Sequence, residues 1–198
     1  LAVINQGLPE YEADNARRHG NAGVTIGVTL LRCVGYLSRG DLSTRNQYAG
    51  PSTATPDAQC LGEHTYRLAL YPFVGEHDDA QLHQPAHEHN VPVLAAETTR
   101  HSGTLPATAS LVEIDAPHLV LSTLKGAEDR EALILRLYNP TMQEQQGRIR
   151  LLRLPRTVVE VNLNEQPIGP ATVDTAGYIS LTMRPKGVRT LMLSWSSV

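Results

Sequence analysis

Histidines and carboxylates gather in residues 76–89, which is the nearest approach to a metal site in this sequence. The histidines are His77, His83, His87 and His89, and the interleaved acids are Glu76, Asp78, Asp79 and Glu88. Side chains four positions apart share one face of a helix, so His83 and His87 could offer a pair of zinc ligands. Pro85 lies between them, and the neighbouring side chains are of the type that faces solvent. We therefore interpret the stretch as a solvated, histidine-rich helix and predict no metal ligands in this chain.

Carboxylate pairs are the second candidate for chemistry. Hydrolysis of a glycosidic bond commonly uses two of them, about 5 to 5.5 Å apart when configuration is retained. Asp41, Asp57 and Glu63 lie in or near a long irregular stretch, and Glu128 and Asp129 lie in a charged connection. Acidic residues in loops are ordinary turn formers and helix caps. We therefore predict no catalytic acid, base or nucleophile in this chain.

Exposed aromatic side chains, on which sugar rings stack, are scarce. The chain has one Trp, one Phe and seven Tyr. Tyr66, Tyr138 and Trp195 lie in strand-like patterns, where packing in the core is the usual role. The Walker loop, the Gly-x-Ser-x-Gly elbow and paired Cys-x-x-Cys motifs are absent from the sequence. Cys33 and Cys60 are predicted to be buried, reduced thiols, with a single disulfide as the alternative.

Charge in the chain is low and dispersed. Its 198 residues carry 17 basic and 20 acidic side chains, a formal net charge of -3. The sequence therefore shows no basic cluster of the kind that binds nucleic acid or an anionic membrane surface. No apolar run reaches the roughly 18 residues typical of a membrane span, and no basic-then-apolar leader is present. We predict a cytoplasmic protein without nucleic-acid or membrane partners. Because Leu1 is not preceded by methionine and opens an apolar, strand-like run, we expect a piece of a longer chain.

Alternating apolar side chains predict an all-β fold built around one long hairpin. In residues 119–140, two alternating arms flank a charged, glycine-bearing connection at 125–131. The other strand-like runs are residues 1–5, 24–32, 64–72, 110–115, 147–154, 157–163, 178–183 and 188–195. Residues 79–89 form the one predicted helix, which Asp78 caps and Pro85 kinks or ends. The alternation indicates half-buried antiparallel strands, so we predict an antiparallel β-sandwich of two packed modules.

A polar connection at residues 97–108 separates two predicted parts. Residues 1–105 form a first β-sandwich portion, truncated at its N-terminus, and residues 106–198 form a C-terminal β-sandwich portion. The first portion contains the longest irregular stretch, the loop 38–57, which glycines and prolines break. A loop of about 20 residues is uncommon inside a compact domain unless it has a function.

The central hairpin also carries a family resemblance. Its Leu-Lys-x-x-Glu-Asp at 124–129 and Leu-Arg-Leu-Tyr-Asn-Pro at 135–140 resemble the C-terminal β-region of bacterial family 38 glycoside hydrolases, the α-mannosidases and mannosylglycerate hydrolases. Further stretches resemble that region in the same order: residues 1–12, 30–59, 62–72 and 159–165. Proteins of this family have an N-terminal α/β barrel that holds zinc and an aspartate nucleophile, then a helical bundle, then β-sandwich domains.

The resemblance implies that the parent protein is a retaining, zinc-dependent α-mannosidase. This chain has no counterpart of the nucleophile or of the zinc ligands, so it is expected to be inactive alone and to carry no cofactor. Its expected partner is the catalytic barrel of the parent chain, whose substrate is a mannoside.

The resemblance also implies that the loop 38–57 reaches the sugar pocket. Arg45 is matched to a sugar-binding arginine of the family, with Arg39 as the second choice and Asp41 as a further substrate-binding residue. The alternative is that Arg45 is a loop residue paired with Asp41 or Asp57. A different class of function also stays open, namely an independent β-sandwich that binds glycans or a protein, which binding of mannose or mannobiose to the isolated chain would favour.

Overall fold

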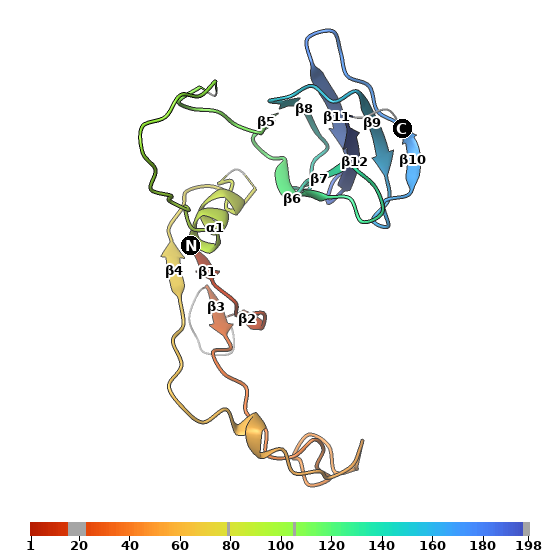
Figure 1. Ribbon diagram of the computed structural model, residues 1–198. Helices are drawn as coiled ribbons and strands as arrows, with labels where there is room; N and C mark the ends of the chain where they lie inside the picture. The colour runs from red at the N-terminus through yellow and green to blue at the C-terminus, as the bar shows by residue number, and fades with distance from the viewer. Residues whose placement is uncertain (16–22, 79, 105, 196–198) are drawn as a thin grey trace. The chain divides into compact units, whose positions relative to one another are not determined.

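The computed structural model describes residues 1–15, 23–78, 80–104 and 106–195 (Figure 1). The chain divides into two compact units. The N-terminal unit contains Leu1–Phe73 and Ala86–Pro92, and the sandwich unit contains Val74–Pro85 and Val93–Val198.

The sandwich unit contains two antiparallel sheets (Figure 1). The five-stranded sheet has the order β10-β9-β12-β7-β6, and the three-stranded sheet has the order β11-β8-β5. The strands are β5 (Val112–Asp115), β6 (Val120–Gly126), β7 (Leu133–Tyr138), β8 (Gln145–Leu151), β9 (Thr157–Val161), β10 (Pro167–Pro170), β11 (Tyr178–Met183) and β12 (Val188–Ser194). This arrangement confirms the predicted all-β, antiparallel sandwich; among the described strands of this unit, only β10 has no counterpart in the prediction.

A single core of aliphatic side chains lies between these two sheets. The five-stranded sheet contributes leucines that are inaccessible to solvent: Leu135 and Leu137 from β7, and Leu191 and Leu193 from β12. The three-stranded sheet contributes Ile149, Ile179, Leu181 and Met183 to the same cluster. Successive side chains of a strand point to opposite faces, so each strand supplies every second residue to this core. Removal of their apolar surface from water is the main term that stabilises the sandwich.

The predicted central hairpin is confirmed by the pairing of β6 with β7. Leu121 lies opposite Leu137 and Leu124 lies opposite Leu135, with an irregularity between Leu121 and Thr123. On its other side β7 pairs antiparallel with β12. The second arm of the hairpin is therefore an interior strand, and this explains why its Leu135 and Leu137 are fully buried.

Gly147 allows the connection between β5 and β6 to pass close to β8. A Cβ atom at this position would lie 2.4 Å from the Cβ of Ala116 and 3.1 Å from Cδ1 of Leu119. Both of these residues belong to the buried core. A glycine inside a strand commonly marks such a close approach, because any side chain would displace the packed neighbour.

Asn139, directly after β7, holds together the turn that follows it. Its side-chain nitrogen donates to the carbonyl oxygens of Gln143 (2.7 Å), Arg184 (3.0 Å) and Met183 (3.3 Å). Its side-chain oxygen accepts from the amide (2.9 Å) and the hydroxyl (2.8 Å) of Thr141. Asn139 is 1% exposed, so these groups depend on it rather than on water.

Glu165 joins two turns that are distant in the sequence. Its carboxylate accepts from the ammonium group of Lys125 (2.7 Å) and from the amide of Glu128 (2.8 Å). Lys125 also forms an ion pair with the carboxylate of Glu128. The hydrogen bond from Lys125, followed by that from the Glu128 amide, lowers the pKa of Glu165 below its ordinary value. The tip of the β6–β7 hairpin is thereby fixed to the turn after β9.

The N-terminal unit contains two smaller antiparallel pairs of strands. In one, β1 (Ala2–Asn5) pairs with β4 (Leu68–Tyr71); in the other, β2 (Tyr11–Asn15) pairs with β3 (Val24–Val28). A short 3-10 helix, η2 (Pro56–Gln59), begins in the last two residues of the loop 38–57. The prediction that residues 1–105 form a sandwich portion separate from residues 106–198 stays a prediction.

The one α-helix among the described residues, α1 (His83–Asn90), confirms the prediction of a helix, although its first residue differs from the predicted one. It begins four positions later than the predicted range 79–89, so Pro85 lies in its first turn. Proline is tolerated there, because the amide groups of the first turn have no partner within the helix. Asp78 does not cap the helix; its carboxylate accepts from the amide of Met142 (3.2 Å).

Replacement of Asn139 by alanine should lower the free energy of unfolding of the sandwich unit by roughly 2–4 kcal/mol, because it leaves several buried polar groups without partners. Urea unfolding followed by the fluorescence of Trp195, the only tryptophan, measures this. Asn164→Ala is the matched control, because Asn164 is an exposed asparagine of another turn. Equal midpoints for the two variants would contradict the role given to Asn139.

The ion pair of Glu165 should make the sandwich less stable in acid. Since the folded pKa of Glu165 is lowered, its contribution is present above the ordinary value of 4.5 and is lost as the pH falls through the folded pKa. Between about pH 6 and about pH 3, the unfolding midpoint of Glu165→Gln should therefore fall less than that of the unsubstituted chain. Glu113→Gln, at an exposed carboxylate, should keep the steeper profile; three parallel profiles would refute the assignment.

Candidate functional site

Within the N-terminal unit, the loop 38–57 begins and ends at a neck of two antiparallel segments. The amide of Leu37 donates to the carbonyl of Thr53 (2.8 Å), and Tyr36 faces Ala54 in an isolated β-bridge. At the far end of the loop, the amide of Arg45 donates to the carbonyl of Leu42 (3.1 Å), which closes a tight turn. The neck thus brings both ends of the loop together.

A surface hollow of about 340 Å³ lies just beyond this neck. It is lined by Tyr36, Arg39, Gly40, Asp41, Tyr48 and Ser52, and we call it the loop hollow. Tyr36 and Tyr48 are 46% and 73% exposed. A Cβ atom on Gly40 would come within 2.7 Å of the Tyr48 ring, so the ring lies directly against the backbone of this glycine. Two aromatic faces and an ion pair therefore border one open hollow.

Arg39 and Asp41 form the ion pair of the loop hollow. Nε of Arg39 donates to Oδ1 of Asp41 (2.8 Å), and a terminal guanidinium nitrogen donates to Oδ2. The hydrogen bond from Arg39 lowers the pKa of Asp41, and the same bond raises the pKa of Arg39. The guanidinium carbon of Arg39 also lies 5.5 Å from the centre of the Tyr36 ring. Asp41 is thus an ionised hydrogen-bond acceptor at neutral pH and not a proton donor.

Arg45, the first choice for a sugar-binding residue, lies outside the lining of the loop hollow. Its guanidinium donates to the backbone carbonyl of Arg39 at 3.5 Å, which is a long bond, and its side chain is exposed. The structure therefore brings Arg39 and Asp41 together and connects Arg45 to them through the backbone. The partner of Asp41 is Arg39, which differs from the alternative that paired Asp41 with Arg45. A substrate-binding role for all three residues stays a prediction.

Two tyrosines of this site were not identified from the sequence. Tyr36 and Tyr48 border the loop hollow, and the only signal for them was their place within a stretch rich in glycine and proline. Such a stretch exposes its aromatic rings because no regular strand covers them. Trp195 packs against the buried core as predicted, and it also lines a pocket between the sheets.

The other residues considered for chemistry do not form a site in the described part of the chain. No three side chains among its His, Cys, Asp and Glu residues are grouped so that they could hold a metal ion. His77 pairs with the adjacent Asp78 (3.1 Å). Cys33 and Cys60 are free thiols as predicted, but neither is buried: Cys60 is partly exposed, and Cys33 is exposed because it precedes the neck of an open loop.

The arrangement in the loop hollow suits contact with a polyhydroxylated ligand. A carboxylate that is already ionised accepts hydrogen bonds from hydroxyl groups, and a guanidinium donates in a fixed plane. The tyrosine rings present apolar faces against which the C–H face of a sugar ring can pack. The hollow contains no pair of free carboxylates, so hydrolysis by a pair of carboxylates has no basis within it.

Comparison with known protein families identifies the family of the sandwich unit. Residues 118–191 match the domain described as "Glycosyl hydrolases family 38 C-terminal beta sandwich domain". The sandwich is a family 38 C-terminal β-sandwich domain. This confirms the resemblance found in the hairpin motifs, since both motif segments lie within the matched residues.

Curated relatives extend the similarity beyond the family 38 domain. A putative mannosylglycerate hydrolase from Halalkalibacterium halodurans is 31% identical over 140 residues, which cover 71% of this chain and 14% of that protein. Human alpha-mannosidase 2C1 is 30% identical over 163 residues, which cover 79% of this chain and 15% of that protein. The chain therefore spans about a seventh of the length of the curated relatives it matches.

Solved structures show the same relationship across nearly the whole chain. An α-mannosidase from Enterococcus faecalis V583 aligns with a TM-score of 0.68 at 28% identity, covering 97% of this chain and 19% of that one. A family 38 glycosyl hydrolase from Enterococcus faecalis aligns equally well and is covered over 20% of its length. Within the described residues, no helix has the length and apolar character needed to span a membrane.

Because the His83–His87 pair is not part of a three-residue group, the 198-residue chain should bind no stoichiometric zinc. Zinc analysis after dialysis of the purified chain measures this. One retained equivalent would contradict the prediction. Its loss in a His83→Ala, His87→Ala double variant would then assign the metal to α1, and its retention would assign it elsewhere.

Proposed function

We propose that this chain is part of a retaining, zinc-dependent α-mannosidase, in which the loop 38–57 helps to bind the mannoside. The observation that carries the proposal is the alignment of 97% of the chain with an α-mannosidase at a TM-score of 0.68. In this proposal the chain partners an N-terminal catalytic barrel of the same polypeptide, and the protein is cytoplasmic.

The catalytic groups belong to the proposed barrel and not to this chain. Retaining hydrolysis needs a nucleophilic carboxylate and an acid about 5 to 5.5 Å from it. Asp41 does not fit the nucleophile, because both of its oxygens accept hydrogen bonds from Arg39. It does not fit the acid, because the same bonds lower its pKa and keep it ionised. The described residues also lack a group that fits zinc, so the proposal places the zinc ligands outside them.

The contribution of the loop to the reaction is the recognition of sugar hydroxyl groups. The Arg39–Asp41 pair presents a donor plane beside an acceptor, and Tyr36 and Tyr48 flank it with apolar surface. Arg45 adds a second guanidinium on the same loop, bonded to the backbone of Arg39. Charge-assisted hydrogen bonds to a ligand are worth more where water is excluded, as in a substrate pocket that a second domain closes.

The Arg45→Ala substitution in the intact enzyme tests this role. It should lower kcat/KM for a mannoside about tenfold, which corresponds to about 1.4 kcal/mol of lost transition-state binding. Folding and bound zinc should not change, because Arg45 is exposed and its side-chain hydrogen bond to the carbonyl of Arg39 is long.

Arg32→Ala provides the matched control for the Arg45 experiment. Arg32 is an exposed arginine of the same unit, paired with Glu10 at 3.0 Å and outside the loop hollow. Its loss should leave the kinetics unchanged. Equal kinetics for Arg45→Ala, Arg32→Ala and the unsubstituted enzyme would limit Arg45 to a structural role.

A further inference from the structure

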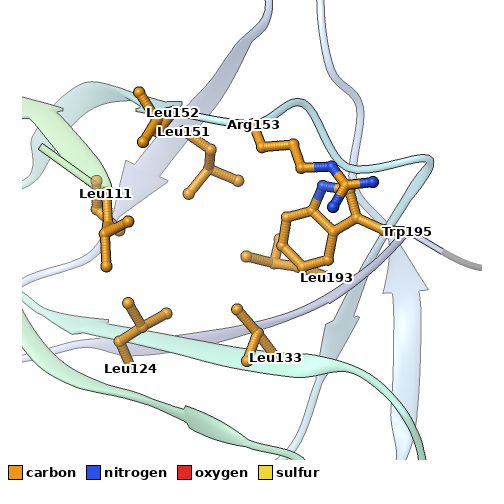
Figure 2. A pocket seen from close by; sticks show the side chains of 9 residues that line it. Leu111, Leu124, Leu133, Leu151, Leu152, Arg153, Leu193 and Trp195 are labelled. Atoms are coloured by element: carbon orange, nitrogen blue, oxygen red, sulfur yellow. The ribbon is translucent and has the colours of Figure 1, made fainter. Parts of the chain in front are cut away.

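A second pocket, which we call the leucine hollow, lies at one end of the sandwich between its two sheets (Figure 2). Its volume is about 260 Å³. Six of its nine lining residues are leucines: Leu111, Leu124, Leu133, Leu151, Leu152 and Leu193. Figure 2 shows their side chains around one common space, contributed by strands of both sheets. The apolar core is therefore open at this end.

The rim of the leucine hollow leaves large apolar side chains in contact with water. Leu111 is 67% exposed and Leu152 is 52% exposed, although Leu193, deeper in the hollow, is fully buried. A contiguous exposed apolar surface of this kind marks a site where something binds, because its removal from water is favourable. An apolar group in the hollow would cover both leucines.

Two polar groups stand at one side of this apolar space. Nε1 of Trp195 is buried and has no hydrogen-bond partner in the described part of the chain. Figure 2 shows the guanidinium of Arg153 on the same side of the hollow as the indole nitrogen. No ion pair or hydrogen bond of the Arg153 side chain occurs among the described residues. A buried indole N–H normally has an acceptor, and an arginine beside it favours an acceptor with negative charge.

The volume limits the ligand to a short apolar chain. A cavity of about 150 Å³ lined by aliphatic and aromatic side chains binds benzene, which has six carbons. In proportion, a hollow of 260 Å³ accommodates roughly ten carbon atoms. This size lies just below the range that is usual for small-molecule pockets.

We propose that the leucine hollow binds a straight-chain carboxylate of about eight to ten carbons. The aliphatic chain occupies the space between the leucines, and the carboxylate accepts hydrogen bonds from the exposed guanidinium of Arg153, next to the buried indole nitrogen of Trp195. Charge complementarity selects the ligand: an alkylammonium ion would face a cation, and an alcohol would bring no charge to Arg153. The site is separate from the loop hollow, and its ligand does not depend on the proposed mannosidase activity.

Titration of the 198-residue chain with decanoate, below the concentration at which it forms micelles, tests the proposal. Trp195 is the only tryptophan, so a saturable change in its fluorescence reports on this hollow, and calorimetry gives an independent measure. Decanoate should bind with a Kd of roughly 1 mM or tighter, and decylammonium should bind much more weakly. Absence of saturable binding by both methods, or equal affinity for the two amphiphiles, would overturn the proposal.

Two pairs of variants locate the bound ligand. Arg153→Gln should weaken decanoate binding roughly tenfold and leave decanol binding unchanged, because only the carboxylate loses its cation. Leu152→Gln should weaken binding of both ligands, whereas Leu163→Gln, at a leucine that is 68% exposed outside the hollow, should not. Circular dichroism confirms that the variants, all at exposed positions, remain folded.

The variants also distinguish this ligand from a second copy of the chain. If the leucine hollow instead binds another copy, the chain will dimerise with concentration, and Leu152→Gln will abolish the dimer while decanoate and decylammonium disrupt it equally. That result would overturn the assignment of a carboxylate ligand. Unchanged decanoate affinity in Arg153→Gln would equally overturn the role given to the charge.

Discussion

Burial of aliphatic side chains between two antiparallel sheets is the interaction on which the sandwich unit depends. Leu135 and Leu137 of β7, with Leu191 and Leu193 of β12, are wholly removed from water, and they belong to the same core cluster as residues of β8 and β11. The strands that carry them must be interior strands, since an edge strand would leave part of its core-facing surface open. The second arm of the β6–β7 hairpin accordingly lies inside the five-stranded sheet, whereas its first arm, β6, forms an edge and is less buried.

The polar motifs that identify the family stand where this apolar core ends. Asn139, of the Leu-Arg-Leu-Tyr-Asn-Pro motif, provides the hydrogen bonds of a buried turn. Lys125 and Glu128, of the first motif, meet Glu165 of the stretch 159–165. Turns at the ends of a sandwich carry backbone groups that neither sheet pairs, and buried groups of this kind need partners. The family resemblance thus rests on residues that maintain the fold.

The sequence predicted the sandwich well because its signal is local. Alternation in residues 119–140 and 178–183 follows directly from the two-residue period of a strand, and the structure confirms both. The start of α1 could not be predicted as well, because Asp78 had two possible partners, the first turn of a helix and the amide of Met142. The sequence does not show that second partner, which lies 64 positions away.

The candidate site was predicted less completely, for a related reason. Arg39 and Asp41 are two residues apart, and their ion pair is local. Tyr36 and Tyr48 join them only because the neck between Leu37 and Thr53 brings the ends of the loop together. The two-residue period of a strand and the 3.6-residue period of a helix carry no information about such a contact within an irregular loop. Aromatic residues in an irregular stretch were therefore the informative signal, and their exposure distinguishes them from the tyrosines of the strands.

The division of roles between the two units follows from how each one is stabilised. The sandwich unit has a continuous core, so it remains ordered without help from its surface residues. The loop 38–57 has no fully buried side chain among its residues and keeps its shape through the bonds of the neck, the Arg39–Asp41 pair and the contact of Tyr48 with Gly40. A segment held by exposed polar bonds opens at low free-energy cost and can adjust to a ligand. The proposed recognition of a sugar therefore suits the open loop better than the rigid sandwich, because the loop has both the hydrogen-bond donors and the freedom to adapt to a ligand.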